Sequence, residues 1–347
     1  MSVGAMPMNG TKEDAAEVIK RKQEHLDMSL LPEVRGGNTG LEAVRLPYDA
    51  MFEVSDEAID TSVTMAGVEL AFPLMFGAMT GGTPLATPFN TCLRGLAARH
   101  RVAMCLGSIR AVLCDEGLLS TYGSGAVEAL FANIGAEQIG QIEHNHLSRV
   151  CERLGVRGLF IHLNGLQEWV QPEGWRHFSV SYDALAHFVD RCDVPVYIKE
   201  VGNGIGGKCA SRLASLNIAG IETASVGGTS WVKVEARRGG GLSRESIESL
   251  SSLGYNLVES LSSCRRALGQ RTLIASGGIS TPLDIVKALS LGADLVAMAQ
   301  PLYRWYREDG AEMLARRIDE YLEVSRLIWR STGARDLKHL HERQGDG

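Results

Sequence analysis

The sequence predicts an α/β fold, a (β/α)8 TIM barrel that carries an N-terminal helical extension. Eight short apolar runs recur along the 347 residues, and each is followed by polar or glycine-rich residues and then by a helical pattern. Continuous apolar runs are typical of strands that are buried on both faces, as in parallel sheets. Because strand and helix alternate eight times, we expect the sheet to close into a barrel.

The predicted strands span residues 73–78, 102–106, 129–134, 158–162, 196–201, 218–223, 272–275 and 295–299, and a helix is predicted over 13–26. We therefore expect an N-terminal extension and lead-in over residues 1–70 and a single barrel domain over 71–347. The connection over residues 227–270 is long and contains Arg237-Arg238-Gly239-Gly240-Gly241. We interpret it as a mobile active-site loop followed by a helix.

The composition excludes several classes of function. The net charge is -6 and no basic block occurs, which argues against a nucleic-acid partner. No stretch approaches the roughly 20 apolar residues of a membrane helix, so we expect no membrane insertion. The seven cysteines are scattered and never form a C-x-x-C pair. They predict reduced thiols in a cytoplasmic protein, with neither disulfides nor a zinc site.

Polar residues gather just after the predicted strands, where barrels of this kind hold their chemistry. The fourth strand runs into His162-Leu163-Asn164-Gly165-Leu166-Gln167-Glu168. The fifth ends in Lys199-Glu200, and a lysine at the end of a buried strand is costly unless it is paired. Lys199 either pairs with Glu200 or serves as a cation for an anionic cofactor. The polar character of the other strand ends favours the cofactor.

The segment after the seventh strand, Ser276-Gly277-Gly278-Ile279-Ser280-Thr281-Pro282, has the features of a phosphate site. Ser280 or Thr281 can cap a helix whose first turn contains Pro282. Free N–H groups at such a helix start, together with the helix dipole, attract phosphate. The pattern predicts a phosphate-binding barrel, but it does not distinguish FMN from a sugar phosphate.

Seven motifs occur in one order along the chain. They are Arg21-Lys22-x-x-His25, Ala78-Met79-Thr80-Gly81-Gly82, Gly107-Ser108-x-Arg110, His162-Leu163-Asn164-x-Leu166-Gln167-Glu168, Lys199-Glu200-Val201-Gly202, Gly227-Gly228-Thr229-Ser230-Trp231 and Ser276-Gly277-Gly278-Ile279. Together they resemble the type 2, FMN-dependent isopentenyl diphosphate isomerase family. The resemblance implies interconversion of isopentenyl and dimethylallyl diphosphate with reduced FMN and Mg²⁺, and with NADPH as the reductant. Nothing is oxidised overall, and the cofactor carries the chemistry.

The resemblance also implies a role for each matching residue. The substrate would bind Arg21, Lys22, Ser108, Arg110 and His162 through its diphosphate and Gln167 near the reacting carbons. FMN would bind Ala78, Met79, Thr80, Ser108, Asn133, Lys199, Thr229, Gly277, Gly278, Ala299 and Gln300. Glu168 would hold Mg²⁺, and the catalytic group would be His162, Gln167, Trp231 and Glu235. Arg21 and Lys22 precede the predicted barrel, so they would fold over its mouth or come from a neighbouring subunit. The alternative for these two residues is a solvated helix face.

The chain departs from the family pattern mainly on the flavin side. Ser280-Thr281 stands where the family often has Arg-Thr or Arg-Asn, so the loop lacks one phosphate-facing cation. Glu222-Thr223-Ala224-Ser225-Val226 precedes Gly227 where Asp-x-x-Gly is usual. The diphosphate and Mg²⁺ residues are retained. These changes leave open a relative that acts on another prenyl diphosphate in a redox-neutral reaction.

Two further hypotheses keep the barrel. A hydroxy-acid oxidase shares the lysine and glycine elements, but it needs a histidine base and arginines near the seventh and eighth strands. The segment 276–282 offers neither. A barrel that has lost its flavin would instead be a binding or regulatory protein. The resemblance also implies a homo-oligomer, a tetramer or an octamer.

Overall fold

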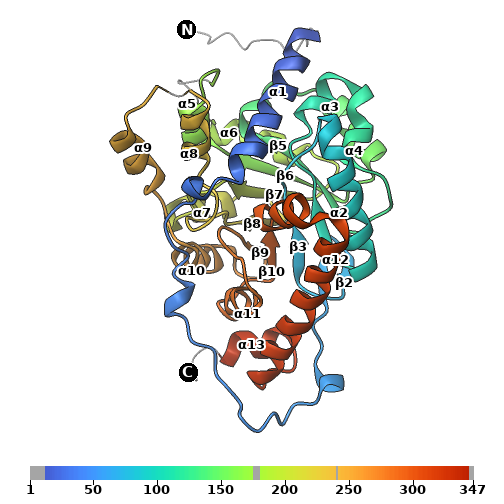
Figure 1. Ribbon diagram of the computed structural model, residues 1–347, viewed down its shortest axis with the longest axis vertical. Helices are drawn as coiled ribbons and strands as arrows, with labels where there is room; N and C mark the ends of the chain where they lie inside the picture. The colour runs from blue at the N-terminus through green and yellow to red at the C-terminus, as the bar shows by residue number, and fades with distance from the viewer. Residues whose placement is uncertain (1–11, 175–179, 240, 344–347) are drawn as a thin grey trace.

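Eight parallel strands form a closed barrel at the centre of the protein (Figure 1). The computed structural model describes residues 12–174, 180–239 and 241–343. In order around the barrel the strands are β3 (Leu74–Phe76), β4 (Ala103–Cys105), β5 (Leu130–Gly135), β6 (Gly158–Leu163), β7 (Val196–Glu200), β8 (Gly220–Glu222), β9 (Thr272–Ala275) and β10 (Leu295–Met298). The predicted fold class is confirmed, and each strand begins and ends within two residues of its prediction.

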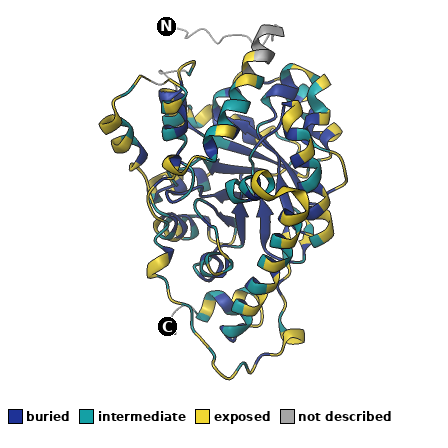
Figure 2. Ribbon diagram, in the orientation of Figure 1, coloured by how far each residue is buried: buried dark blue, intermediate teal, exposed yellow. Residues whose placement is uncertain are grey.

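Burial on both faces explains why the strands appear as continuous apolar runs. Every residue of β5 is buried, as expected for a strand with the barrel interior on one face and helices on the other. In the interior, the rings of Phe131, Phe160 and Tyr197 pack together with centroids 5.0 to 5.6 Å apart. Figure 2 shows the strands as the most buried part of the molecule, inside helices whose outer faces are exposed.

The lead-in contains an antiparallel hairpin of β1 (Val63–Met65) and β2 (Val68–Leu70). Its turn residues, Ala66-Gly67, both have positive φ, as a type I′ turn requires. Met65 and Leu70 are buried against the interior aromatic rings. The hairpin therefore closes the barrel at the end where the strands begin. The division of the chain at residue 70 stays a prediction.

Helices cover the outside of the barrel. The α-helices apart from the 231–268 segment are α1 (Lys12–Ser29), α2 (Thr87–His100), α3 (Arg110–Cys114), α4 (His144–Leu154), α5 (Gly165–Val170), α6 (Tyr182–Asp190), α7 (Gly207–Ala214), α11 (Pro282–Ser290), α12 (Gln300–Ser331) and α13 (Leu337–Glu342). Single 3-10 segments are η1 (Pro32–Val34), η2 (Leu41–Ala43), η3 (Asp56–Ala58), η4 (Pro84–Ala86), η5 (Glu116–Tyr122) and η6 (Ala136–Gln138). Among the described residues, no helix combines the length and apolar character that crossing a bilayer requires.

The prediction of a mobile loop after the sixth strand was wrong over most of its length. The structure has three helices there, α8 (Trp231–Arg237), α9 (Arg244–Ser251) and α10 (Leu257–Leu268). Each begins at a side-chain cap, because Ser230, Ser243 and Asn256 accept hydrogen bonds from N–H groups of the first turn. We interpreted this segment as a mobile loop because of its glycines, but the caps stabilise helices in it. Residue 240 of the predicted loop lies outside the described residues.

The N-terminal helix α1 packs on the barrel beside α3 and α8 (Figure 1). It begins one residue before the predicted helix and ends three residues after it. At its C-terminal end, Gln300 of α12 donates a hydrogen bond from Nε2 to the carbonyl oxygen of Ser29 at 3.1 Å. The chain thus folds its own N-terminal helix back over the barrel mouth, so Arg21 and Lys22 need no neighbouring subunit to reach it.

Candidate active site

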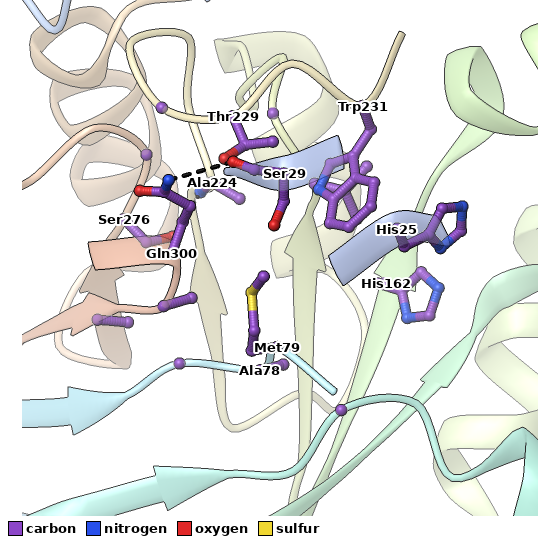
Figure 3. A pocket seen from close by; sticks show the side chains of 18 of the residues that line it. His25, Ser29, Ala78, Met79, His162, Ala224, Thr229, Trp231, Ser276 and Gln300 are labelled. Carbon is purple, nitrogen blue, oxygen red and sulfur yellow. Dashed lines mark hydrogen bonds between the residues drawn. The ribbon is translucent and has the colours of Figure 1, made fainter. Parts of the chain in front are cut away.

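A cavity of about 630 Å³ lies where the barrel strands end, under α1 (Figure 3). Residues at or just after the ends of all eight strands line it. The residues of α1 that line it are Arg21, Lys22, His25 and Ser29. All predicted substrate-binding, flavin-binding and metal-binding residues line this cavity, and so do His162, Gln167 and Trp231. Of the predicted site residues, only Glu235 lies behind the cavity wall.

One end of the cavity concentrates positive charge. The Lys22 ammonium donates hydrogen bonds to the carbonyl oxygens of Ser108, at 2.8 Å, and Gly81. Burial lowers the pKa of Lys22 to about 7, and the charges of Arg21 and Arg110 add to the effect. Burial and Arg110 also lower the pKa of Arg21. Three cations that repel one another here form a site that an anion would stabilise, which argues against a solvated helix face for α1.

His162 is neutral beside these cations. Burial lowers the pKa of His162 most, and the positive charges of Lys199 and Lys22 add to the effect, so that the pKa is about 3. Its Nδ1 lies 2.5 Å from Oδ1 of Asn133, the flavin-binding candidate on the neighbouring strand β5. This contact fixes the imidazole ring at the cavity wall between the cationic end and Lys199.

Oxygen atoms gather next to the cationic end. Asn164 donates from Nδ2 to Oε1 of the buried Glu168 at 3.1 Å. Oδ1 of Asn164 and Oε2 of Glu137 are buried without a hydrogen-bond partner among the described residues. Burial raises the pKa of Glu137 to about 7, and Glu168 raises it further. A cation would relieve both the unpaired oxygens and the carboxylate repulsion. Sequence analysis assigned Glu168 alone to this group.

Glu235 organises the catalytic candidates from behind the cavity wall. It is fully buried, and Oε1 lies 2.7 Å from Nε2 of His25 and 3.0 Å from Nε2 of Gln167. Burial alone would raise the pKa of Glu235, but hydrogen bonds from His25, Gln167 and Arg238 outweigh it and hold the pKa below its ordinary value. The ring of Trp231 meets the His25 ring edge-on at 5.2 Å. Glu235 therefore stays ionised and orients two cavity-lining side chains.

Arg238 connects this group to three segments of the chain. Its guanidinium binds Glu235 at 2.6 Å, Glu24 of α1 at 2.8 Å and Glu173, which follows α5, at 2.8 Å. These ion pairs fasten α1 onto α8 above the cavity. Sequence analysis missed Arg238 because it placed that residue in a mobile loop. The Ser230 cap predicts a helix in which Glu235 and Arg238, three residues apart, lie on one face.

Lys199 is paired, but with a partner that the sequence analysis did not name. Its Nζ lies 3.3 Å from Oε1 of Glu222, and both side chains are buried. The Glu200 carboxylate instead accepts hydrogen bonds from the backbone N–H groups of residues 201–204. Ser276 also donates from Oγ to Glu222 at 2.8 Å. The Lys199–Glu200 pair was therefore wrong, while Lys199 itself does line the cavity.

The loop after β9 forms the other end of the cavity. Gly277 and Gly278 have φ of 105° and 86°, and a Cβ at Gly277 would come within 2.2 Å of a backbone oxygen. Thr281 caps α11 as predicted, and Pro282 is in its first turn. Asp284 accepts hydrogen bonds from the N–H groups of residues 280 and 281. Those two N–H groups are therefore not free for a ligand, contrary to the prediction.

Figure 3 shows how the two ends face each other. Gln300 and Ser276 lie on one side of the cavity, and His25 and His162 lie on the other. Met79 lies between them, and Trp231 projects toward the same space. The cavity thus offers an apolar middle between a strongly cationic end and a glycine-rich end. Such an arrangement can bind a flat ligand with a terminal phosphate next to a second, diphosphate-bearing ligand.

Proteins similar to this chain in sequence include isomerases. The sequence model of the FMN-dependent dehydrogenase family matches residues 164–344. An isopentenyl-diphosphate delta-isomerase of Mycobacterium marinum is 37% identical over 341 residues, covering 95% of this chain and 97% of that protein. The enzyme of the same name from Rickettsia bellii is 32% identical over 328 residues, covering 93% and 96%. That from Nostoc sp. is 35% identical over 300 residues, covering 84% and 85%.

Known structures with this fold include mandelate oxidases. One with an FMN adduct has a TM-score of 0.61 at 15% identity and covers 94% of each chain. Another, with (S)-mandelic acid, has a TM-score of 0.62 at 17% identity and covers 95% of each chain. At this identity the likeness shows a shared fold alone. The segment 276–282 still lacks the histidine and arginine that the oxidase hypothesis needs.

Proposed function

Because the chain belongs to the type 2 isopentenyl-diphosphate delta-isomerase family, we propose that it interconverts isopentenyl and dimethylallyl diphosphate with reduced FMN and Mg²⁺. The observation that carries the proposal is the cationic end of the cavity. Arg21, Lys22 and Arg110 are gathered there from two helices, and a diphosphate supplies negative charge to all three, of which Arg21 already has one ion pair, with Glu173 at 3.7 Å. Bidentate arginine contacts suit phosphate oxygens.

The other end of the cavity fits FMN. Oε2 of Glu222 and Oγ of Ser225 line the cavity and are buried without a partner among the described residues. Gly277 and Gly278 pack too closely on the backbone of Ser225 and Gly227 for any side chain, and this packing holds their loop at the cavity wall. Lys199 provides a cation for the electron-rich edge of a reduced flavin. When bound, reduced FMN supplies the proton transfers at the alkene carbons.

The residues of the chain supply binding and orientation. Arg21, Lys22, Ser108, Arg110 and His162 hold the diphosphate. Gln167 faces the reacting carbons, and Glu235 fixes its amide from behind. Trp231 covers the apolar middle of the cavity, where its ring face stabilises positive charge that develops on the prenyl chain.

Glu168 is the proposed Mg²⁺ ligand. Its neighbours Asn164 and Glu137 each carry a buried oxygen without a partner among the described residues, and oxygen is the donor that Mg²⁺ prefers. No group of three or more His, Cys, Asp and Glu in the described residues could hold a metal by itself. This agrees with Mg²⁺, which commonly keeps waters and binds through one or two carboxylates together with substrate phosphates.

Three wider features belong to the same proposal. NADPH is the reductant of the flavin, and the protein acts in the cytoplasm as a homo-oligomer, a tetramer or an octamer. The cytoplasmic assignment rests on the sequence, in which the seven cysteines are scattered and never form a C-x-x-C pair.

The decisive experiment is an anaerobic assay with the flavin-loaded protein. The protein is loaded with FMN, the flavin is reduced, and isopentenyl diphosphate is added with Mg²⁺. We expect dimethylallyl diphosphate to accumulate to equilibrium, followed by NMR. A prenyl diphosphate of longer chain is tested in parallel, because the departures around Glu222 and Ser280 leave another substrate open. Absence of turnover on both substrates with bound, reduced FMN would overturn the proposal.

The metal assignment is tested in the same assay. The Glu168→Gln variant keeps the size of the side chain but removes its charge. We expect it to require a higher Mg²⁺ concentration than the wild type for half-maximal turnover. Glu152→Gln, an exposed change on α4, is the control and leaves the Mg²⁺ dependence unaltered. An unchanged Mg²⁺ requirement in Glu168→Gln would exclude Glu168 as a ligand.

Lys22 is expected to link substrate affinity to pH. Its pKa is about 7 in the protein, and a bound diphosphate favours the ammonium and raises this pKa. Binding therefore takes up a proton above pH 7, so the affinity falls as the pH rises, by up to about tenfold per unit. In Lys22→Arg the cation stays charged and this fall is lost. Titration calorimetry at several pH values measures it, and Lys20→Arg on the exposed face of α1 is the matched control.

A further inference from the structure

The glycine loop after β9, residues 276–279, offers backbone hydrogen-bond donors but has no positively charged side chain. The N–H groups of Gly277, Gly278 and Ile279 have no hydrogen-bond partner in the described parts of the chain. The loop lines the cavity and directly follows Ser276, which lies across the cavity from His25 and His162 (Figure 3). Its next residues are the uncharged Ser280 and Thr281. Backbone donors are present in this loop, and a positively charged side chain is not.

The carboxylate of Asp284 adds negative charge beside this loop, which makes a positive charge nearby more important for binding phosphate. Oδ2 of Asp284 accepts hydrogen bonds from Ser280 N–H at 3.1 Å and from Thr281 N–H at 2.9 Å. The negative charge of Asp284 is thus held directly beside the loop, at the start of α11. A phosphate bound to the loop would be repelled by it unless a nearby cation compensates.

Arg304 is placed to supply this cation from another element. It lies four residues after Gln300 in α12, so the two side chains share one face of the helix, and both line the cavity. Tyr321 of the same helix and Ser280 of the loop also line the cavity, and the Tyr321 hydroxyl donates to the Ser280 carbonyl at 2.9 Å, which joins α12 to the loop. The Arg304 guanidinium has no hydrogen bond, ion pair or aromatic contact with the described residues. It is a half-buried cation without a counter-charge.

The other cations around the cavity, except Arg35, are paired or lie in the cationic cluster. The other cations that line it are Arg21, Lys22, Arg35, Arg110 and Lys199. Three of them form the cluster at the opposite end, and Lys199 is paired with Glu222 at 3.3 Å. Arg35 is exposed after η1 and is the remaining competitor for the role.

We propose that Arg304 binds the phosphate of FMN and supplies the positive charge that the loop itself does not carry. The phosphate would accept hydrogen bonds from the loop N–H groups and from the guanidinium, which also offsets Asp284. This inference rests on the proposed flavin function and extends it, because it assigns the phosphate recognition to α12. The chain would then distinguish FMN from riboflavin through a residue of this helix.

The test compares FMN with riboflavin, which has the same ring system without the phosphate. Flavin-free protein is titrated with each flavin, and the quenching of flavin fluorescence gives the dissociation constants. We expect Arg304→Met to weaken FMN binding by about 10- to 100-fold, the range of a charged hydrogen-bonding contact, and to leave riboflavin binding unchanged. Arg304→Lys should retain part of the preference for FMN.

Two matched variants separate the alternatives. Arg307→Met removes an arginine of the same helix that contacts Tyr303 and Asp27 outside the cavity, and it should change neither constant. Equal FMN affinity in Arg304→Met and wild type would overturn the inference, as would loss of the preference in Arg35→Met instead. Wild-type protein that binds neither flavin would overturn the flavin proposal itself, and this inference with it.

Discussion

In the Glu235→Gln variant, kcat is expected to fall by about 10²-fold, the cost of misplacing a group beside the reacting atoms, while the barrel stays folded. The wild-type carboxylate accepts hydrogen bonds from His25, Gln167 and Arg238. Glutamine has nearly the same shape, but the NH2 group of its amide is a donor and would face the donors of the neighbouring side chains. Gln167 then loses its fixed orientation toward the substrate. Arg238 keeps two other carboxylates, so α1 and α8 remain connected.

The measurement is kcat and KM with saturating reduced FMN, together with circular dichroism to check folding. Glu24→Gln is the matched control, because Glu24 also binds Arg238, at 2.8 Å, but does not contact Gln167 or His25. We expect Glu235→Asp to recover part of kcat, since it restores the charge. A loss confined to KM, or an equal loss in Glu24→Gln, would contradict orientation of Gln167 by Glu235.

The Lys199→Met variant is expected to lower the free energy of unfolding by about 3–5 kcal/mol, the usual cost of leaving one partner of a buried ion pair without the other. Lys199 and Glu222 are 7% and 3% exposed, so water does not replace the lost ammonium. Glu222 retains the hydrogen bond from Ser276, but its second oxygen has no partner among the described residues. Urea unfolding of the flavin-free protein measures the effect.

The double variant Lys199→Met/Glu222→Leu tests the cause. Replacing both partners of a buried pair by apolar groups is often neutral, so we expect most of the lost stability to return. Lys233→Met removes a lysine paired with the exposed Glu248, and it should cost only about 0–1 kcal/mol because solvent screens that pair. If the double variant were as unstable as Lys199→Met, an uncompensated Glu222 charge would not be the cause.

The barrel could be predicted from the sequence because burial of a strand on both faces requires a run of apolar residues within that strand alone. Each strand needs apolar residues at consecutive positions, and β5 is buried throughout. Most of the cavity lining followed from this, since polar residues after parallel strands meet at one end of a barrel. The helix predicted at the end of the segment 227–270 is α10, but α8 and α9 were missed although their caps at Ser230 and Ser243 are visible in the sequence. There, the glycines were given more weight than the caps.

Partners across strands could not be predicted in the same way. Neighbouring residues in a strand point to opposite faces, so Lys199 and Glu200 cannot share one side of β7. Lys199 and Glu222 are instead register partners of β7 and β8. That pairing depends on the register between two strands that a helix separates in the sequence. The residues of neither strand specify this register. The same holds for Arg238, whose contact with Glu24 joins residues more than 200 positions apart.

The position of α1 over the mouth has a consequence for biosynthesis. This helix leaves the ribosome before the barrel strands, yet its residues His25, Glu24 and Ser29 contact Glu235, Arg238 and Gln300, which are translated much later. Contacts between such distant parts of a chain form slowly, because a long loop must close first. The nascent chain can therefore pair most of its strands before these contacts hold α1 in place, whereas the partners of Lys22 are translated early. An incomplete chain that ends before α12 has the helix but lacks the glutamine that holds its last turn.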